Sequence, residues 1–168
     1  MLFRSGGEND SPARQPARYI KAVGERYLPK MKVDLVYRRD RCLRGGDHFP
    51  FLDVGVAAMR ITEPNEDFHH QYRDVRVKNG VRFGDLPEFV NFAYTADVVR
   101  VNAAALASLA IGPTAPQEVL MEYLVVDNKT TFRWTANTEP NVTGYRVVRR
   151  ETTAPFWQKF EAVGNVTV

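Results

Sequence analysis

The three histidines of this 168-residue chain all lie in residues 45–74, "GGDHFPFLDVGVAAMRITEPNEDFHHQYRD". In the second half of this stretch His70 and Asp74 form an H-x-x-x-D pair, preceded by Glu63, Glu66 and Asp67. A neutral imidazole is a good zinc ligand, and a nearby carboxylate can orient it through its other ring nitrogen. The pair alone is weak evidence for a metal site, because a loop histidine beside acids is more often an ordinary surface group.

The first half of the stretch combines polar and apolar groups in seven residues, Gly45 to Phe51. The two glycines allow close backbone approach, Asp47 and His48 are polar, and Phe49 and Phe51 are large and apolar. Such a mixture could form a pocket that holds an apolar side chain beside a polar centre. It is equally typical of a tight turn that enters a short core helix, and the residues alone leave both interpretations open.

The elements around the histidines predict an α/β fold. Apolar spacing after a Ser-Pro start predicts a helix at residues 11–27, and alternation predicts a strand at 31–38. A short turn or helix is expected at 48–55, followed by a longer apolar run at 56–62 that predicts a strand buried on both faces. Apolar residues at three- and four-residue steps predict the strongest helix, at 85–112. Their order indicates part of a mostly parallel sheet flanked by helices, in which ligands bind at loops beyond the carboxyl ends of strands.

The pattern changes after residue 111. A Pro-rich linker, 112–118, is followed by short apolar runs separated by turn residues, which predict strands within 119–168. The segment "FRWTANTEPNVTGYRVVRR" resembles the early strands of a fibronectin type III domain, with Trp134 in its core and Tyr145 opening the next strand. Because a complete sandwich needs about 100 residues, 119–168 is expected to be a partial one.

Composition excludes several classes of function. The net charge is +3, but the basic residues are scattered in short groups, which indicates a solvated surface and no nucleic-acid partner. The longest apolar run, 101–111, is too short for a membrane span. A lone cysteine, Cys42, excludes an internal disulfide framework. The three Asn-x-Thr sequons, at Asn128, Asn141 and Asn165, are most simply chance occurrences in Thr-rich strands.

The histidine stretch resembles the final part of zinc-dependent exopeptidases of metallopeptidase family twenty-eight, relatives of bacterial leucyl aminopeptidase. In that family an (S/G)-D-H-x-x-F element precedes a buried strand, a Glu, and a Tyr-His-Thr-x-x-Asp-like element whose His is the last zinc ligand. Asp47-His48 with Phe51 match the first element, Glu63 the glutamate, and His70 with Asp74 the last. His69 stands where the family has an aromatic residue, and "QYR" replaces the Thr-containing spacer.

The resemblance implies an aminopeptidase with two zinc ions that acts on peptide substrates in a secreted or periplasmic setting. It assigns zinc binding to His70, with His69 as the fallback, because neighbours in an extended segment point to opposite sides. It makes Asp47, His48 and Asp74 groups that shape the site, and Phe49 and Phe51 the wall of a side-chain pocket. The other ligands and the general base are expected upstream of Ser11, so that residues 1–111 would be the C-terminal part of the catalytic domain and the chain alone would be inactive.

Two alternatives remain. Glutaminyl cyclases share the fold and a D-H-x-P-F segment like that at Asp47 to Phe51, but use one zinc ion and form a lactam. The chain could also be a non-catalytic binding or accessory fragment whose fibronectin-like strands form an interaction surface. The fibronectin-like segment and the "RVNAAALA" helix favour the peptidase over the cyclase.

Overall fold

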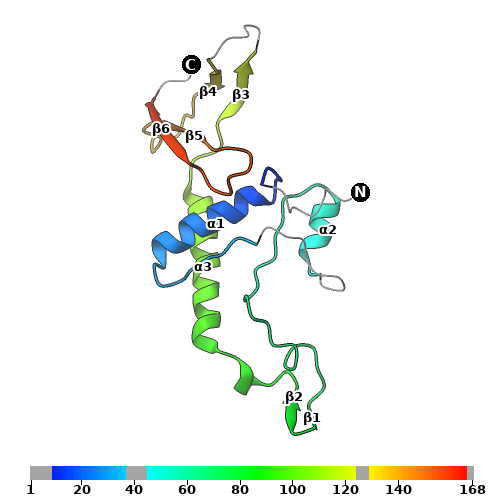
Figure 1. Ribbon diagram of the computed structural model, residues 1–168. Helices are drawn as coiled ribbons and strands as arrows, with labels where there is room; N and C mark the ends of the chain where they lie inside the picture. The colour runs from blue at the N-terminus through cyan, green and yellow to red at the C-terminus, as the bar shows by residue number, and fades with distance from the viewer. Residues whose placement is uncertain (1–8, 37–44, 124–128, 166–168) are drawn as a thin grey trace. The chain divides into compact units, whose positions relative to one another are not determined.

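The computed structural model describes residues 9–36, 45–123 and 129–165 (Figure 1). The chain divides into two compact units, Met1–Ala107 and Ser108–Val168. No helix in the described ranges is long and apolar enough to cross a membrane.

Two predicted helices are confirmed. Helix α1 spans Arg14–Tyr27 and helix α3 spans Phe92–Ile111, with a 3-10 turn, η1, at Pro87–Phe89 before it. The most buried side chains of α3 are Val101 and Ala105, 4% and 2% exposed. Val101 lies against Gly24 of α1, where the missing side chain permits the approach. The short helix α2, His48–Asp53, is the turn or helix expected there.

The two strands predicted between these helices do not form within the described residues. Residues 31–36 alternate between half-buried and exposed, as a strand with one covered face would, but they are in no β-ladder, and Tyr37 lies outside the described ranges. The segment 56–62 is also in no ladder, and its residues are exposed or half-buried. The prediction of a buried strand at 56–62 is therefore wrong for this structure, because a strand needs a paired neighbour as well as apolar residues.

A hairpin that the apolar pattern did not predict follows the last two histidines. Strand β1, Arg76–Lys78, pairs antiparallel with β2, Val81–Phe83. Asn79 and Gly80 join them with φ of 51° and 76°, and positive φ at both central residues is the geometry of a type I′ turn. The Asn-Gly pair is itself the sequence signal for this turn.

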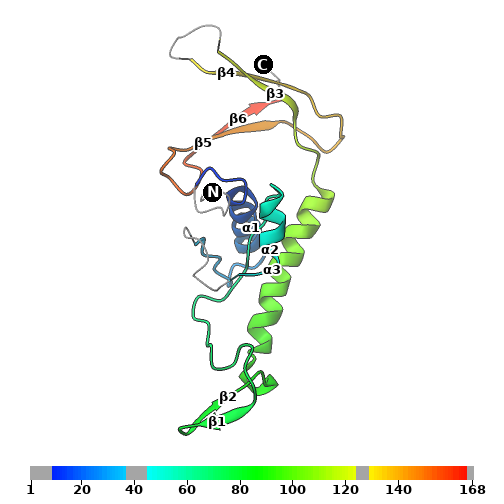
Figure 2. The ribbon, with the colours of Figure 1, turned by 90° about the vertical axis from the view of Figure 1, so that its right-hand side faces the viewer.

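In the second unit the expected strands form two antiparallel pairs. Strand β3, Gln117–Glu122, pairs with β4, Thr131–Thr135, and β5, Tyr145–Arg149, pairs with β6, Lys159–Gly164 (Figure 2). The Trp134 and Tyr145 rings meet edge to face with centroids 5.1 Å apart. The Tyr145 hydroxyl accepts a hydrogen bond from the backbone N–H of Asn137 at 2.7 Å. The parallel sheet and the fibronectin-like sandwich remain predictions.

Candidate functional site

Asp67 organises the loop that carries the last two histidines. Its Oδ1 accepts a hydrogen bond from the backbone N–H of His69 at 2.9 Å and lies 2.7 Å from His69 Nδ1. These two contacts, the backbone one first, lower the pKa of the Asp67 carboxyl below its usual value. The carboxylate therefore stays ionised further into the acid range than a free aspartate would.

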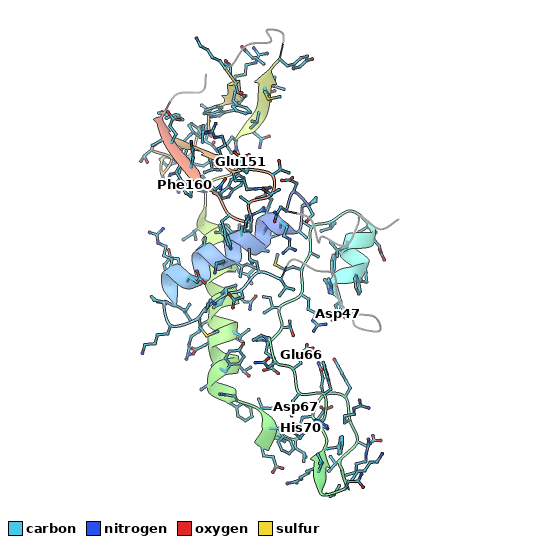
Figure 3. The ribbon with its side chains drawn as sticks, viewed as in Figure 1. Asp47, Glu66, Asp67, His70, Glu151 and Phe160 are labelled. Atoms are coloured by element: carbon cyan, nitrogen blue, oxygen red, sulfur yellow. The ribbon has the colours of Figure 1, made fainter. Side chains whose placement is uncertain are left out.

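His70 is the more enclosed of the two histidines. Its ring stacks on Phe89 with centroids 3.6 Å apart and an interplanar angle of 19°, and its side chain is 22% exposed, against 54% for His69. The Nε2 atom lies 3.6 Å from Asp67 Oδ2, while the buried Nδ1 has no hydrogen-bond partner in the described part of the chain. Figure 3 shows Asp67 and His70 next to one another. His70 thus combines a nearby carboxylate with a ring nitrogen, Nδ1, that makes no hydrogen bond within the described ranges.

The hairpin holds this loop in place. The backbone N–H of Gly84 donates to the His69 carbonyl at 3.0 Å, and the Tyr72 N–H donates to Asp85 Oδ1 at 3.0 Å. Gly84 has φ of 127°, and a Cβ there would lie 2.9 Å from Val75 Cα. Glycine is therefore required at position 84 both by the backbone angle and by the close approach.

The Gly45–Phe51 segment forms a tight turn into α2. The His48 and Phe49 rings stack with centroids 4.4 Å apart, and the Phe49 N–H donates to the Gly46 carbonyl at 3.1 Å. Asp47 directly precedes α2, is exposed, and makes no side-chain cap. Phe51 is 55% exposed. The segment thus forms a turn, with Phe51 at the surface, and its role in a side-chain pocket stays a prediction.

Arg60 connects the two histidine-bearing segments. Its guanidinium lies 3.5 Å from the Gly45 carbonyl oxygen, donates to Thr62 Oγ1 at 3.2 Å and forms an ion pair with Glu66. The Thr62 hydroxyl also donates to Glu66 at 2.6 Å, and the Glu66 side chain is only 9% exposed. Reasoning from the sequence missed Arg60, because no local spacing pairs it with Gly45.

An open cleft with an acidic lining is formed by the segment 62–71, whose residue His70 is not part of the lining. Its volume is about 220 Å³, and its lining residues are Thr62, Glu63, Glu66, Asp67 and Gln71. Figure 3 shows Glu66 and Asp67 on the same stretch of chain and Asp47 at the start of α2. Carboxylates in such a lining attract cationic groups, including metal ions and amines.

The two parts of the expected H-x-x-x-D pair have different surroundings. Asp74 is 97% exposed and lies 3.9 Å from Arg76, so the carboxylate beside His70 is that of Asp67. Across the described ranges, no group of three or more His, Cys, Asp and Glu side chains is placed to hold a metal ion.

Known proteins similar to this chain carry the name "Probable zinc metalloprotease". One from Leptosphaeria maculans is 50% identical over 161 residues, which are 96% of this chain and 37% of that protein. Relatives from Pyrenophora tritici-repentis and Pyricularia oryzae are 47% and 48% identical over 96% of this chain and 33% of their own length. No protein-family model and no solved structure matches. The chain is thus similar along nearly all its length to about one third of each of these relatives.

Proposed function

We propose that this chain is part of a zinc metallopeptidase and that His70 is one of its zinc ligands. The observation that carries the proposal is the 50% identity, over 96% of the chain, to a protein named as a probable zinc metalloprotease. Because the chain spans about a third of such relatives, we assign the remaining ligands and the general base to a part of a longer protein.

The surroundings of His70 fit one ligand of such a site. Zinc binds neutral imidazole nitrogen, and a ligating histidine is commonly oriented by a carboxylate at its second nitrogen. His70 offers a buried Nδ1 with no hydrogen-bond partner in the described ranges, and Asp67 lies at the Nε2 side. A catalytic zinc has three protein ligands, of which His70 would supply one, with Asp67 orienting its ring.

The finer proposal is an aminopeptidase with two zinc ions, secreted or periplasmic. Zinc, when bound, would polarise the first peptide carbonyl and lower the pKa of its water. The acidic cleft formed by Glu63, Glu66 and Asp67 would hold the positively charged amino end of a peptide. His48 and Phe49, stacked on one another, would border the side-chain pocket together with Asp47 and Phe51.

A chimera tests the proposal. The matched segment of the Leptosphaeria maculans relative is replaced by the 161 matching residues of this chain, and bound zinc and hydrolysis of leucine p-nitroanilide are measured. We expect the chimera to hydrolyse the substrate. His70→Ala should remove most of the activity and lower the bound zinc, whereas His69→Ala should retain both.

Three results would count against the proposal. Equal loss with His69→Ala and His70→Ala would reject the assignment of the ligand. Lactam formation from an N-terminal glutaminyl peptide without hydrolysis would favour the cyclase. Loss of hydrolysis by the chimera, with its fold retained by circular dichroism and the parent relative active, would favour a non-catalytic role for this chain.

A further inference from the structure

One of the three Asn-x-Thr sequons, Asn141-Val142-Thr143, lies outside the strands of the second unit. Strand β4 ends at Thr135 and β5 begins at Tyr145. The connection between them runs as an open loop (Figure 2). The chance interpretation from sequence placed the sequons within Thr-rich strands, and the structure removes that reason for Asn141.

Asn141 stands at the tip of a β-turn. The Val142 N–H donates to the Glu139 carbonyl at 3.1 Å, so that Pro140 and Asn141 are the two central residues of the turn. Proline suits the first of these positions because its ring fixes φ, and asparagine is common in turns. Asn141 and Thr143 are both exposed.

Hydrogen bonds to Thr114 hold the residues before the turn in place, while Asn141 at the tip is exposed. The Glu139 carboxylate accepts hydrogen bonds from the Thr114 N–H at 2.8 Å, the Thr114 hydroxyl at 2.6 Å and the Asn137 amide at 3.2 Å. The Asn137 amide also donates to the Thr114 carbonyl at 2.9 Å. For the Asn141 amide, by contrast, the described residues provide no hydrogen bond.

We propose that Asn141 accepts an N-linked oligosaccharide when the chain passes through the secretory pathway of a eukaryotic cell. The Asn141 amide nitrogen forms a bond to C1 of the first sugar of a lipid diphosphate oligosaccharide. The bond from that carbon to the diphosphate oxygen breaks, the lipid diphosphate leaves, and the amide proton passes to solvent. A bulky glycan is compatible only with a surface position, which the exposed turn provides. The inference is independent of peptidase activity.

The test is expression of the chain in yeast behind a heterologous secretion leader. Asn128→Gln and Asn165→Gln remove the other two sequons, so Asn141 is the only acceptor left. We expect one electrophoretic band of reduced mobility that peptide-N-glycosidase collapses to the position of the bare chain. Cell extract and medium are both analysed, so that retention inside the cell does not hide the modification.

Matched variants identify the acceptor. In the same background Asn141→Gln and Thr143→Ala should lose the slower band, while Thr143→Ser, which keeps the hydroxyl, should retain it. Absence of the slower band before any change at Asn141, or its persistence in Asn141→Gln, would overturn the proposal. Tryptophan fluorescence of each variant checks that the second unit is folded, because Trp134 and Trp157 both lie there.

Discussion

The contact between α1 and α3 at Gly24 predicts that replacing this helical glycine by alanine lowers the stability of the chain, whereas the same change in an exposed helix raises it. A Cβ at position 24 would lie 2.9 Å from Val101 Cγ1 and 3.4 Å from Val33 Cγ2, whereas carbon atoms pack best about 3.5–4.0 Å apart. In an exposed helix, replacing glycine by alanine stabilises by about 0.8–1 kcal/mol. At Gly24 the gain is opposed by overpacking, which costs about 1–3 kcal/mol.

We therefore expect Gly24→Ala to lower the free energy of unfolding by about 0–2 kcal/mol. Val101→Ala, at a side chain 4% exposed, should lower it by about 1.5–3 kcal/mol, because two methyl groups leave a cavity. In the double variant the new methyl group enters that cavity. The double variant should therefore be more stable than the sum of the two changes predicts, by about 1–3 kcal/mol.

Urea unfolding followed by far-UV circular dichroism measures this cycle, because the helices dominate that signal and α1 lies in the first unit. Tryptophan fluorescence serves as the internal control, since Trp134 and Trp157 report on the second unit and should not change. The reasoning would be refuted if Gly24→Ala stabilised the chain by the full helix-propensity gain and the double variant showed no coupling.

Two further predictions concern single charged groups. Arg60→Met should lower the free energy of unfolding by about 1–3 kcal/mol, because Glu66, 9% exposed, loses a charged hydrogen bond. The control variant Arg76→Met, at a side chain 43% exposed, should change the free energy of unfolding by less than about 0.5 kcal/mol. Equal effects of the two variants in urea unfolding would contradict the stabilising role of the Arg60–Glu66 ion pair. Hydrogen bonds from the hydroxyl and backbone N–H of Thr114 lower the pKa of Glu139 to about 2 from 4.5, so its stabilising contribution is complete above pH 4.5 and is lost as the pH falls toward 2. Glu139→Gln should flatten that part of the stability profile, measured as the urea midpoint by tryptophan fluorescence; an unchanged acid dependence would argue against it.

The helices could be predicted from sequence because their evidence is local. Apolar residues at three- and four-residue steps predicted that α3 is a helix but did not identify its buried face. Val99 and Leu106, which lie on those steps, are 60% and 67% exposed, whereas Val101 and Ala105 are buried. Strands are different, since the apolar run at 56–62 indicates what the segment could cover but not which strand pairs with it. The Asn79-Gly80 turn is also a local signal, but it lies in the residue types of the turn and not in apolar periodicity.

The site was predictable as a region and not as a set of partners. The sequence drew attention to His70, whose buried ring nitrogen the structure then describes. Asp74 was favoured by its four-residue spacing, yet the His70 N–H donates to the Asp67 carbonyl at 3.2 Å, and this turn places a residue three positions earlier beside the ring. Arg60 was not predictable, because a side chain that spans fifteen residues to Gly45 leaves no periodic pattern.

The hydrogen bond between His69 and Gly84 also bears on the order of folding. It joins the two ends of the segment 69–84, which contains the β1–β2 hairpin and its two-residue turn. The residues that shape the histidine loop are therefore close to one another in sequence. Hairpins of this kind form in about 1–10 μs, and local contacts need little loop-closure entropy. The packing of Gly24 on Val101 joins residues far apart along the chain. His69 and His70 are therefore expected to reach their arrangement early, before the two helices meet.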